Sequence, residues 1–153
     1  MCIRDRRYSY RSDPLVPDFD DQHPIMVFDG FCGLCSGFID FALRHDPQGE
    51  LRFLPAQSEL GEILFNHYGL KRGDDDYDTM LLIQDGHLYT KLDAGIRMIS
   101  DLGWPWKAIK ILRILPRAIG NIFYNLVARN RIKWFGARTT CRLPTAEEKA
   151  RFL

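Results

Sequence analysis

Residues 25–35 read IMVFDGFCGLC and carry the strongest structural signal in the chain, because a short apolar run passes through a glycine-containing turn into two cysteines. The apolar run Ile25–Phe28 is too short for a helix and ends at Asp29-Gly30, which is typical of a strand buried on both faces. Apolar residues then recur at helical spacing, so we predict a helix that starts near Gly33. The two cysteines therefore lie where a strand ends and a helix begins.

The next segments predict a parallel pair of strands. The helix from Gly33 should end by Asp46-Pro47, because proline cannot continue a helix. Residues 51–54, LRFL, are mostly apolar and predict a second strand. A crossover through a helix is normally right-handed and makes the two strands parallel.

A second helix and a hairpin follow along the chain. Ser58 is suited to cap a helix that ends at Gly69, and Asp85-Gly86 is suited to a type I′ turn between strands at 79–84 and 87–91. We expect Asp93 to cap a further helix that runs through Leu102. The resulting order, β-α-β-α-β-β-α with a mixed sheet, is that of the α/β thioredoxin-like core.

The two ends of the chain should differ from this core. The polar, proline-containing residues 1–22 predict a flexible leader, and residues 23–153 a single domain. Residues 104–153 should form a helical extension, in which Pro116 separates two helices and residues 130–138 form a basic, aromatic connection. The capping box Thr145-Ala-Glu-Glu predicts a short terminal helix.

Composition narrows the class of protein. The 153 residues are 46% hydrophobic and 27% charged, as in an ordinary single domain, and 21 Lys and Arg balance 20 Asp and Glu, which gives no reason to expect nucleic acid as a partner. No secretory signal and no apolar span of about 18 residues is visible. We therefore predict a cytoplasmic protein, in whose reducing surroundings a close cysteine pair indicates redox or metal chemistry.

The cysteine pair favours thiol-disulfide exchange. The N–H groups and dipole at a helix N-terminus stabilise a thiolate, so we expect Cys32 to be the exposed attacking thiol. Cys35, one turn further on, could resolve a mixed disulfide and leave a disulfide bond within the pair. Gly30 would allow the tight turn, and Gly33 would leave space between the thiols.

Two features of this site leave alternatives open. Asp29 could accept the proton of Cys35 or could simply bind backbone donors in its turn, and the second role is the commoner one for such an acid. The pair is also half of a zinc site, which would need two further ligands from a set that shows no tight ligand spacing. That set is Cys2, His23, His45, His67, His87 and Cys141. We predict no metal and no cofactor.

Residues 27–35, VFDGFCGLC, resemble the DGxCxxC signature of the DCC family of thiol-disulfide oxidoreductases. The resemblance extends through residues 51–58, the hairpin, Asn130-Arg131 and residues 134–136, and it covers the chain from about Pro24 onward. It implies a thioredoxin-like fold, a redox function, and a thiol or disulfide substrate with an unknown reducing partner. Related thioredoxin-like proteins place a cis-proline opposite the dithiol, where this chain has Asp78-Thr79. Residues at those positions and around the cysteines should therefore line the site, namely Gly30, Phe31, Gly33, Leu34, Asp78 and Thr79.

The segment from Lys107 to Arg142 is basic and contains no acid. Its helices could bind a membrane surface or an acidic partner, although such a face is more often merely solvated. The alternative hypothesis is accordingly that the protein is a non-catalytic thioredoxin-like binding module. Its basic helices would then make a peripheral contact with a membrane surface or bind a protein partner. Cys141 is expected to be a small buried hydrophobe rather than a third reactive thiol.

Overall fold

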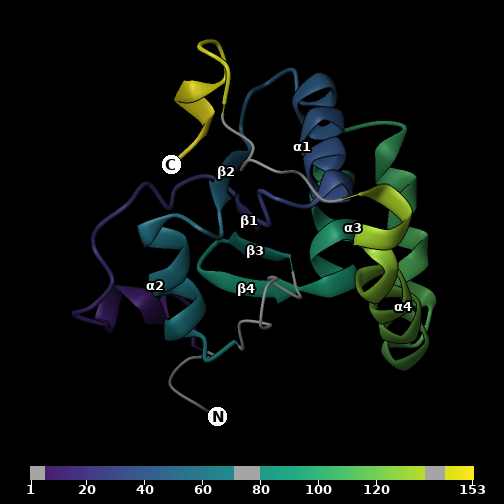
Figure 1. The fold of residues 1–153 in the computed structure, drawn as a ribbon, viewed down its shortest axis with the longest axis horizontal. Coiled ribbons are helices and arrows are strands. Elements are labelled where there is room, and N and C mark those ends of the chain that lie inside the picture. Colours follow the sequence, from purple (N-terminus) through teal and green to yellow (C-terminus); the bar gives the residue numbers. More distant parts are fainter. Residues whose placement is uncertain (1–5, 71–79, 137–143) are drawn as a thin grey trace.

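The computed structural model describes residues 6–70, 80–136 and 144–153 and shows an α/β fold around a four-stranded open sheet (Figure 1). The strand order is β2-β1-β3-β4, in which β1 pairs parallel with β2 and the other two pairs are antiparallel. The prediction of a mixed sheet in a thioredoxin-like fold is therefore confirmed. The strands are β1 (Ile25–Phe28), β2 (Arg52–Pro55), β3 (Leu81–Gln84) and β4 (His87–Thr90).

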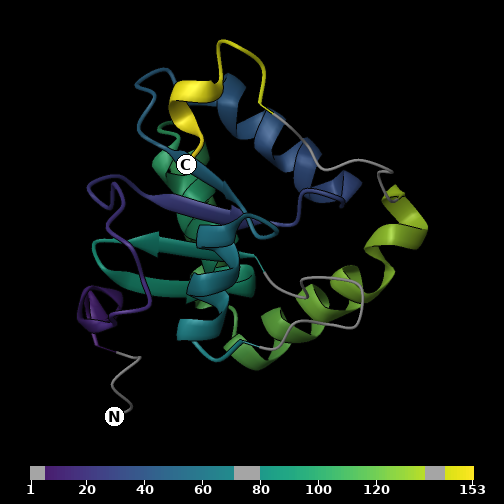
Figure 2. The same ribbon diagram turned by 60° about the vertical axis from the view of Figure 1, so that its left-hand side comes forward.

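Helices cover both faces of the sheet and produce two separate cores (Figure 2). Alternate side chains of a strand point to opposite faces, so Met26 and Phe28 join one core while Ile25 and Val27 join the other. Helices α1 (Gly33–His45) and α3 (Lys91–Asp101) cover the first core, and α2 (Glu59–His67) covers the second. All four residues of β1 are buried, as the uninterrupted apolar run predicted.

Local signals placed most element ends correctly. The Ser58 side chain accepts a hydrogen bond from the Gly61 N–H at 3.1 Å and caps α2. Asp85 and Gly86 have φ angles of 51° and 75°, as a type I′ turn requires. The expectation that Asp93 caps α3 is wrong. This helix starts at Lys91, so Asp93 lies in its first turn.

The expected helical extension contains one short and one long element. A 3₁₀ helix, η3 (Trp106–Ile114), precedes α4 (Arg117–Phe135), with Pro116 between them. The connection predicted at 130–138 is wrong as far as the structure describes it, because α4 continues through Asn130 and Arg131 to Phe135. The short terminal helix predicted from the capping box is a single 3₁₀ turn, η4 (Lys149–Arg151).

Residues 6–22 pack against the sheet, so the expectation of a flexible leader is wrong for this part of the chain. Tyr10 is only 2% exposed and belongs to the core beneath α2. The Tyr8 N–H donates to the Gly86 carbonyl at 2.8 Å, and Ser9 bonds His67 at 2.9 Å. The segment shows no apolar periodicity because it is held by single anchoring contacts rather than by a repeated apolar face.

The end of the chain covers the outer edge of β2. The Leu153 N–H donates to the Phe53 carbonyl at 3.0 Å, and Phe152 packs its ring against Phe28 and Phe53. Pairing of this kind protects an edge strand from other chains. Among the residues that the structure describes, no helix is long and apolar enough to cross a membrane.

Candidate active site

The cysteine pair lies at the junction between β1 and α1, where the sequence predicted it. Cys32 is the N-cap residue of α1, and its Sγ accepts a hydrogen bond from the Cys35 N–H at 3.5 Å. Both cysteines are reduced. Cys32 is 0% exposed and Cys35 is 4% exposed, so the expectation that Cys32 is an exposed thiol is wrong for this conformation.

The two thiols have opposite acidities because they share a hydrogen bond. The bond from the Cys35 thiol lowers the pKa of Cys32 to about 6, against the opposing effect of burial. The N–H groups of Cys35 and Leu34 and the Arg131 guanidinium act in the same direction as that bond. The shared bond and burial raise the pKa of Cys35 well above the ordinary thiol range. At neutral pH the arrangement therefore favours a Cys32 thiolate beside a protonated Cys35.

Asp29 forms the turn between β1 and α1. Its Oδ1 accepts bonds from the Phe31 N–H at 2.9 Å and from the Gln57 side-chain amide at 2.6 Å. Gln57 also accepts a bond from the Gly30 N–H at 3.1 Å, so its amide holds both residues of the Asp-Gly pair. The turn-forming role of Asp29 is present in the structure, and its role as a base stays a prediction.

Arg131 contacts both Asp29 and Cys35, and sequence reasoning did not place it at the site. Its Nη2 lies 3.3 Å from Oδ2 of Asp29, and its Nη1 lies 3.9 Å from Sγ of Cys35. The side chain is 4% exposed, although it comes from a segment whose composition suggested a solvated basic face. The sequence did contain an indication of Arg131, because Asn130-Arg131 belongs to the part of the chain that resembles the DCC family. Gln57, which binds Asp29, was also not singled out, although it lies in residues 51–58, which share that resemblance.

Gly33 is required by a neighbouring backbone rather than by the second thiol. A Cβ at this position would lie 2.6 Å from the Phe135 carbonyl oxygen and 3.0 Å from that of Gly136. The Gly33 N–H donates to the Gly136 carbonyl at 3.2 Å. The C-terminal end of α4 thus lies directly on the N-terminus of α1, next to Cys32.

The remaining predicted site residues divide into two groups. Gly30 is buried, Phe31 is exposed beside the turn, and Leu34 packs partly against the core that contains both thiols. Asp78, Thr79 and Cys141 lie outside the described residues. Met80 is described, and its N–H donates to the Tyr124 hydroxyl of α4 at 3.1 Å.

An apolar cavity of about 250 Å³ lies beside Cys35, between α1, α3, η3 and α4. Cys35 and Arg131 contribute to its wall, whereas Cys32 does not. Its other lining side chains are mostly apolar and include Leu34, Phe38, Met80, Ile99, Leu112 and Val127.

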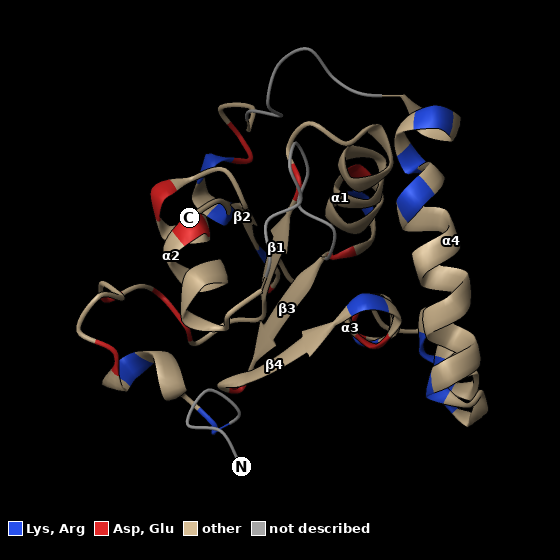
Figure 3. Ribbon diagram, turned by 60° about the horizontal axis from the view of Figure 1, so that its bottom comes forward, with Lys and Arg blue, Asp and Glu red and all other residues tan. Residues whose placement is uncertain are grey.

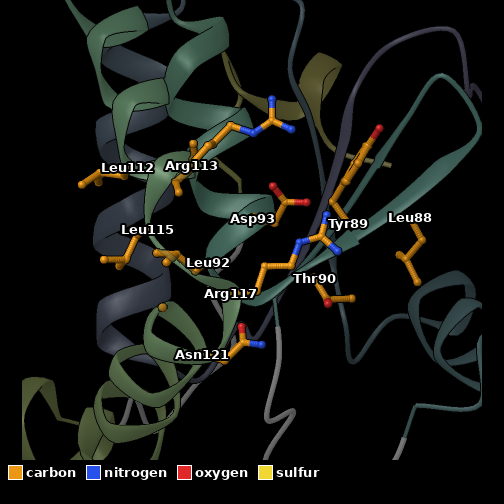
Figure 4. Close-up of a pocket in the computed structure, with 12 residues that line it drawn as sticks. Leu88, Tyr89, Thr90, Leu92, Asp93, Leu112, Arg113, Leu115, Arg117 and Asn121 are labelled. Carbon is orange, nitrogen blue, oxygen red and sulfur yellow. The ribbon is translucent and has the colours of Figure 1, made fainter.

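A larger cavity of about 480 Å³ contains none of the predicted site residues (Figure 4). It lies where β4 and α3 meet η3 and the start of α4, and Asp93, Arg113 and Arg117 are among its polar side chains. It shares Leu92, Ile96 and Leu112 with the cavity beside Cys35, but neither Cys32 nor Cys35 lines it.

No group of three or more His, Cys, Asp or Glu residues that could hold a metal ion occurs within residues 6–70, 80–136 and 144–153. Two of the histidines considered as zinc ligands bind other partners. His45 bonds the Phe41 carbonyl at 2.8 Å, and His67 bonds Asp13 at 2.7 Å.

Comparisons with known proteins agree with this geometry. The family model described as DCC1-like thiol-disulfide oxidoreductase matches residues 26–137, which include both cysteines, Asp29, Gln57 and Arg131. The uncharacterized protein YuxK of Bacillus subtilis is 37% identical over 129 residues, which cover 84% of this chain and 93% of that protein. A chloroplastic DCC family protein of Arabidopsis thaliana is 33% identical over 125 residues, covering 81% of this chain and 72% of the relative. No solved structure matches significantly. The chain therefore belongs to the DCC1-like thiol-disulfide oxidoreductase family.

Proposed function

We propose that this protein is an enzyme that exchanges thiols and disulfides, with Cys32 as the nucleophile and Cys35 as the resolving thiol. The observation that carries the proposal is the pair itself, in which a hydrogen bond from Cys35 lowers the pKa of Cys32 to about 6. A thiol with this pKa is roughly nine-tenths thiolate at pH 7, whereas an ordinary thiol is only a few per cent ionised. The substrate is a disulfide of a protein or a small molecule.

In the first step the Cys32 thiolate attacks one sulfur of the substrate disulfide. A bond forms between Cys32 and that sulfur, the substrate S–S bond breaks, and the other substrate sulfur leaves as a thiolate. In the second step Cys35 loses its proton and attacks Sγ of Cys32. The mixed disulfide then breaks, the second substrate thiolate leaves, and the enzyme holds a Cys32–Cys35 disulfide. Two electrons have passed to the substrate, and an external thiol reductant must return them to the enzyme.

The second step needs a Cys35 thiolate, which burial disfavours. The Arg131 guanidinium lies 3.9 Å from Sγ of Cys35 and lowers its pKa, so it stabilises the anion that must form. Because the hydrogen bond to Cys32 is the largest factor that raises the pKa of Cys35, this barrier falls once Cys32 is tied up in the mixed disulfide. Asp29, which is bound to Arg131, is proposed as the acceptor of the released proton.

Substrate access to Cys32 requires a local opening, because this thiol is fully buried. The contact between the Gly33 N–H and the Gly136 carbonyl is a single hydrogen bond of 3.2 Å at the end of α4. Movement of this helix end would uncover the N-terminus of α1. We place the activity in a reducing compartment such as the cytoplasm, where thiol reductants can restore the dithiol.

The decisive experiment measures the ultraviolet absorbance of the thiolate against pH in the reduced protein. The wild type should show one thiolate with a midpoint near pH 6, which Cys32→Ser removes and which Cys35→Ser keeps with a somewhat higher midpoint. Reduction of a small aromatic disulfide should then depend on Cys32 and, for complete turnover, on Cys35. If both thiols ionise only above pH 8, the proposed enzymatic role is wrong.

A further inference from the structure

We propose that η3 and α4 together form a surface that binds anionic lipid membranes from one side. This surface, the basic apolar face, comprises the solvent-directed side chains of residues 104–135. The inference goes beyond thiol exchange and does not depend on it, because none of the exposed side chains that form this face belongs to the dithiol site.

The 3₁₀ geometry of η3 sorts its residues into three rows, because side chains three positions apart are eclipsed. One row contains Ile109 and Leu112, which line the cavity beside Cys35, and Leu112 is also 44% exposed. A second row carries the cations Lys107, Lys110 and Arg113. The third row is apolar and solvent-directed, and it contains Ile111 at 68% exposure and Ile114 at 81% exposure.

Helix α4 is apolar on its outer side as well as its inner side. Its inner side contains Gly120, which meets Leu92, and Tyr124, whose hydroxyl binds the Met80 N–H. The outer side exposes apolar residues over the first part of the helix, namely Ile119, Ile122, Phe123 and Leu126. A helix that is apolar on opposite sides normally lies between two apolar surroundings, and here the protein supplies only one of them.

The segment that forms this face carries charge of a single sign. Between Leu102 and Gly136 the chain contains no Asp or Glu, as the α4 ribbon in Figure 3 illustrates, and its cations other than the buried Arg131 are exposed. Acids of other elements lie near some of these cations, because Lys110 and Arg113 line one cavity with Asp85 and Asp101, and Arg113 lines another with Asp93. Trp104 at 81% exposure and Trp134 at 55% exposure lie near the two ends of the segment. Cations beside exposed tryptophan and aliphatic side chains are the composition of interfacial membrane helices.

Charge complementarity selects the occupant. A second copy of the chain would bring two surfaces of the same positive sign together, which a two-fold contact cannot avoid. An anionic lipid surface offers negative headgroups for the cation rows and hydrocarbon for the apolar rows at the same time. The contact would be peripheral, because no described helix can span a bilayer.

The test is co-sedimentation of the reduced full chain with vesicles of phosphatidylcholine, with and without phosphatidylserine. We expect binding to the vesicles that contain phosphatidylserine, and we expect salt to weaken it. The charge variant Lys107→Gln/Lys110→Gln/Arg113→Gln should reduce the partition coefficient on the order of 100-fold, since each cation near such a surface contributes about fivefold. The variant Ile111→Ser/Ile114→Ser should also weaken binding.

Matched controls alter exposed residues elsewhere. Arg44→Gln and Lys149→Gln remove exposed cations outside the face, and Leu15→Ser removes an apolar side chain that is 77% exposed. These controls should leave vesicle binding unchanged, and every variant should keep the wild-type circular dichroism and thiolate titration.

Three outcomes would overturn the proposal. These are equal binding to neutral vesicles, concentration-dependent dimerisation with no vesicle binding, and binding to poly-glutamate in place of vesicles. The thiolate titration measures the ionisation of the dithiol independently of vesicle binding. A failure of membrane binding therefore leaves the proposed enzyme activity testable by itself.

Discussion

Replacement of Arg131 by methionine tests the connection between α4 and the dithiol. Methionine keeps much of the length and apolar volume of the side chain but removes its charge and its donors. In the wild type, Nη2 of Arg131 lies 3.3 Å from Oδ2 of Asp29, and the two side chains are 4% and 2% exposed. Arg131→Met therefore removes a buried cation that lies beside a buried carboxylate.

The expected loss of stability follows from this burial. Removal of one partner from a buried ion pair typically costs about 3–5 kcal/mol. Asp29 keeps its bonds from the Phe31 N–H and the Gln57 amide, so we expect a value near the lower end, about 3 kcal/mol. The pKa of Cys32 should rise as well, because the guanidinium contributes to lowering it.

Urea denaturation of the reduced protein and the thiolate titration measure these two effects. Arg129→Met is the matched control, because Arg129 is exposed on the same helix and its loss should change the free energy of unfolding by no more than about 0.5 kcal/mol. The double variant Asp29→Asn/Arg131→Met removes both charges and should recover at least about 1 kcal/mol of the loss. If Arg131→Met and Arg129→Met are equally stable, Arg131 does not neutralise a buried Asp29 carboxylate in the folded protein.

Three further predictions concern other parts of the molecule. Lowering the pH through about 6 should protonate Cys32 and suppress exchange in the wild type. Cys35→Ala removes the thiol donor and should move the midpoint of Cys32 ionisation upward, and Cys35→Ser should move it less. Thiolate absorbance measures these midpoints. Gly33→Ala should lower the free energy of unfolding in urea by more than about 1 kcal/mol, since the added Cβ would lie 2.6 Å from the Phe135 carbonyl oxygen. Gly37→Ala in the same helix, whose Cβ would meet nothing within 4 Å, should raise it by about 0.5–1 kcal/mol. Changes of the same sign in both variants would contradict the packing of α4 on Gly33. Tyr10→Ala should lower the free energy of unfolding by about 3 kcal/mol or more, because the ring is buried in the core, and a negligible change would mean that the segment is not docked.

Features that depend on neighbouring residues could be predicted from the amino-acid sequence. The apolar run before Asp29-Gly30 predicted a buried central strand, and the change to helical spacing placed Cys32 and Cys35 at a helix N-terminus. The Asp85-Gly86 pair predicted the hairpin because only a few residues accept the backbone angles of such a turn. Each of these signals lies within a few residues of the structure that it determines.

The chemistry around the thiols depends instead on contacts between distant parts of the chain. Arg131 lies 102 positions from Asp29 and looks like one more cation in a basic helix, until the packing of α4 on α1 buries it. The same packing creates the need for Gly33, beside which the Phe135 and Gly136 carbonyls lie. Periodicity shows that a helix has an apolar side, but it does not show which other element will cover that side. The burial of the two thiols and the nearby Arg131 charge, which both act on the pKa values of the dithiol, therefore exist only in the folded chain.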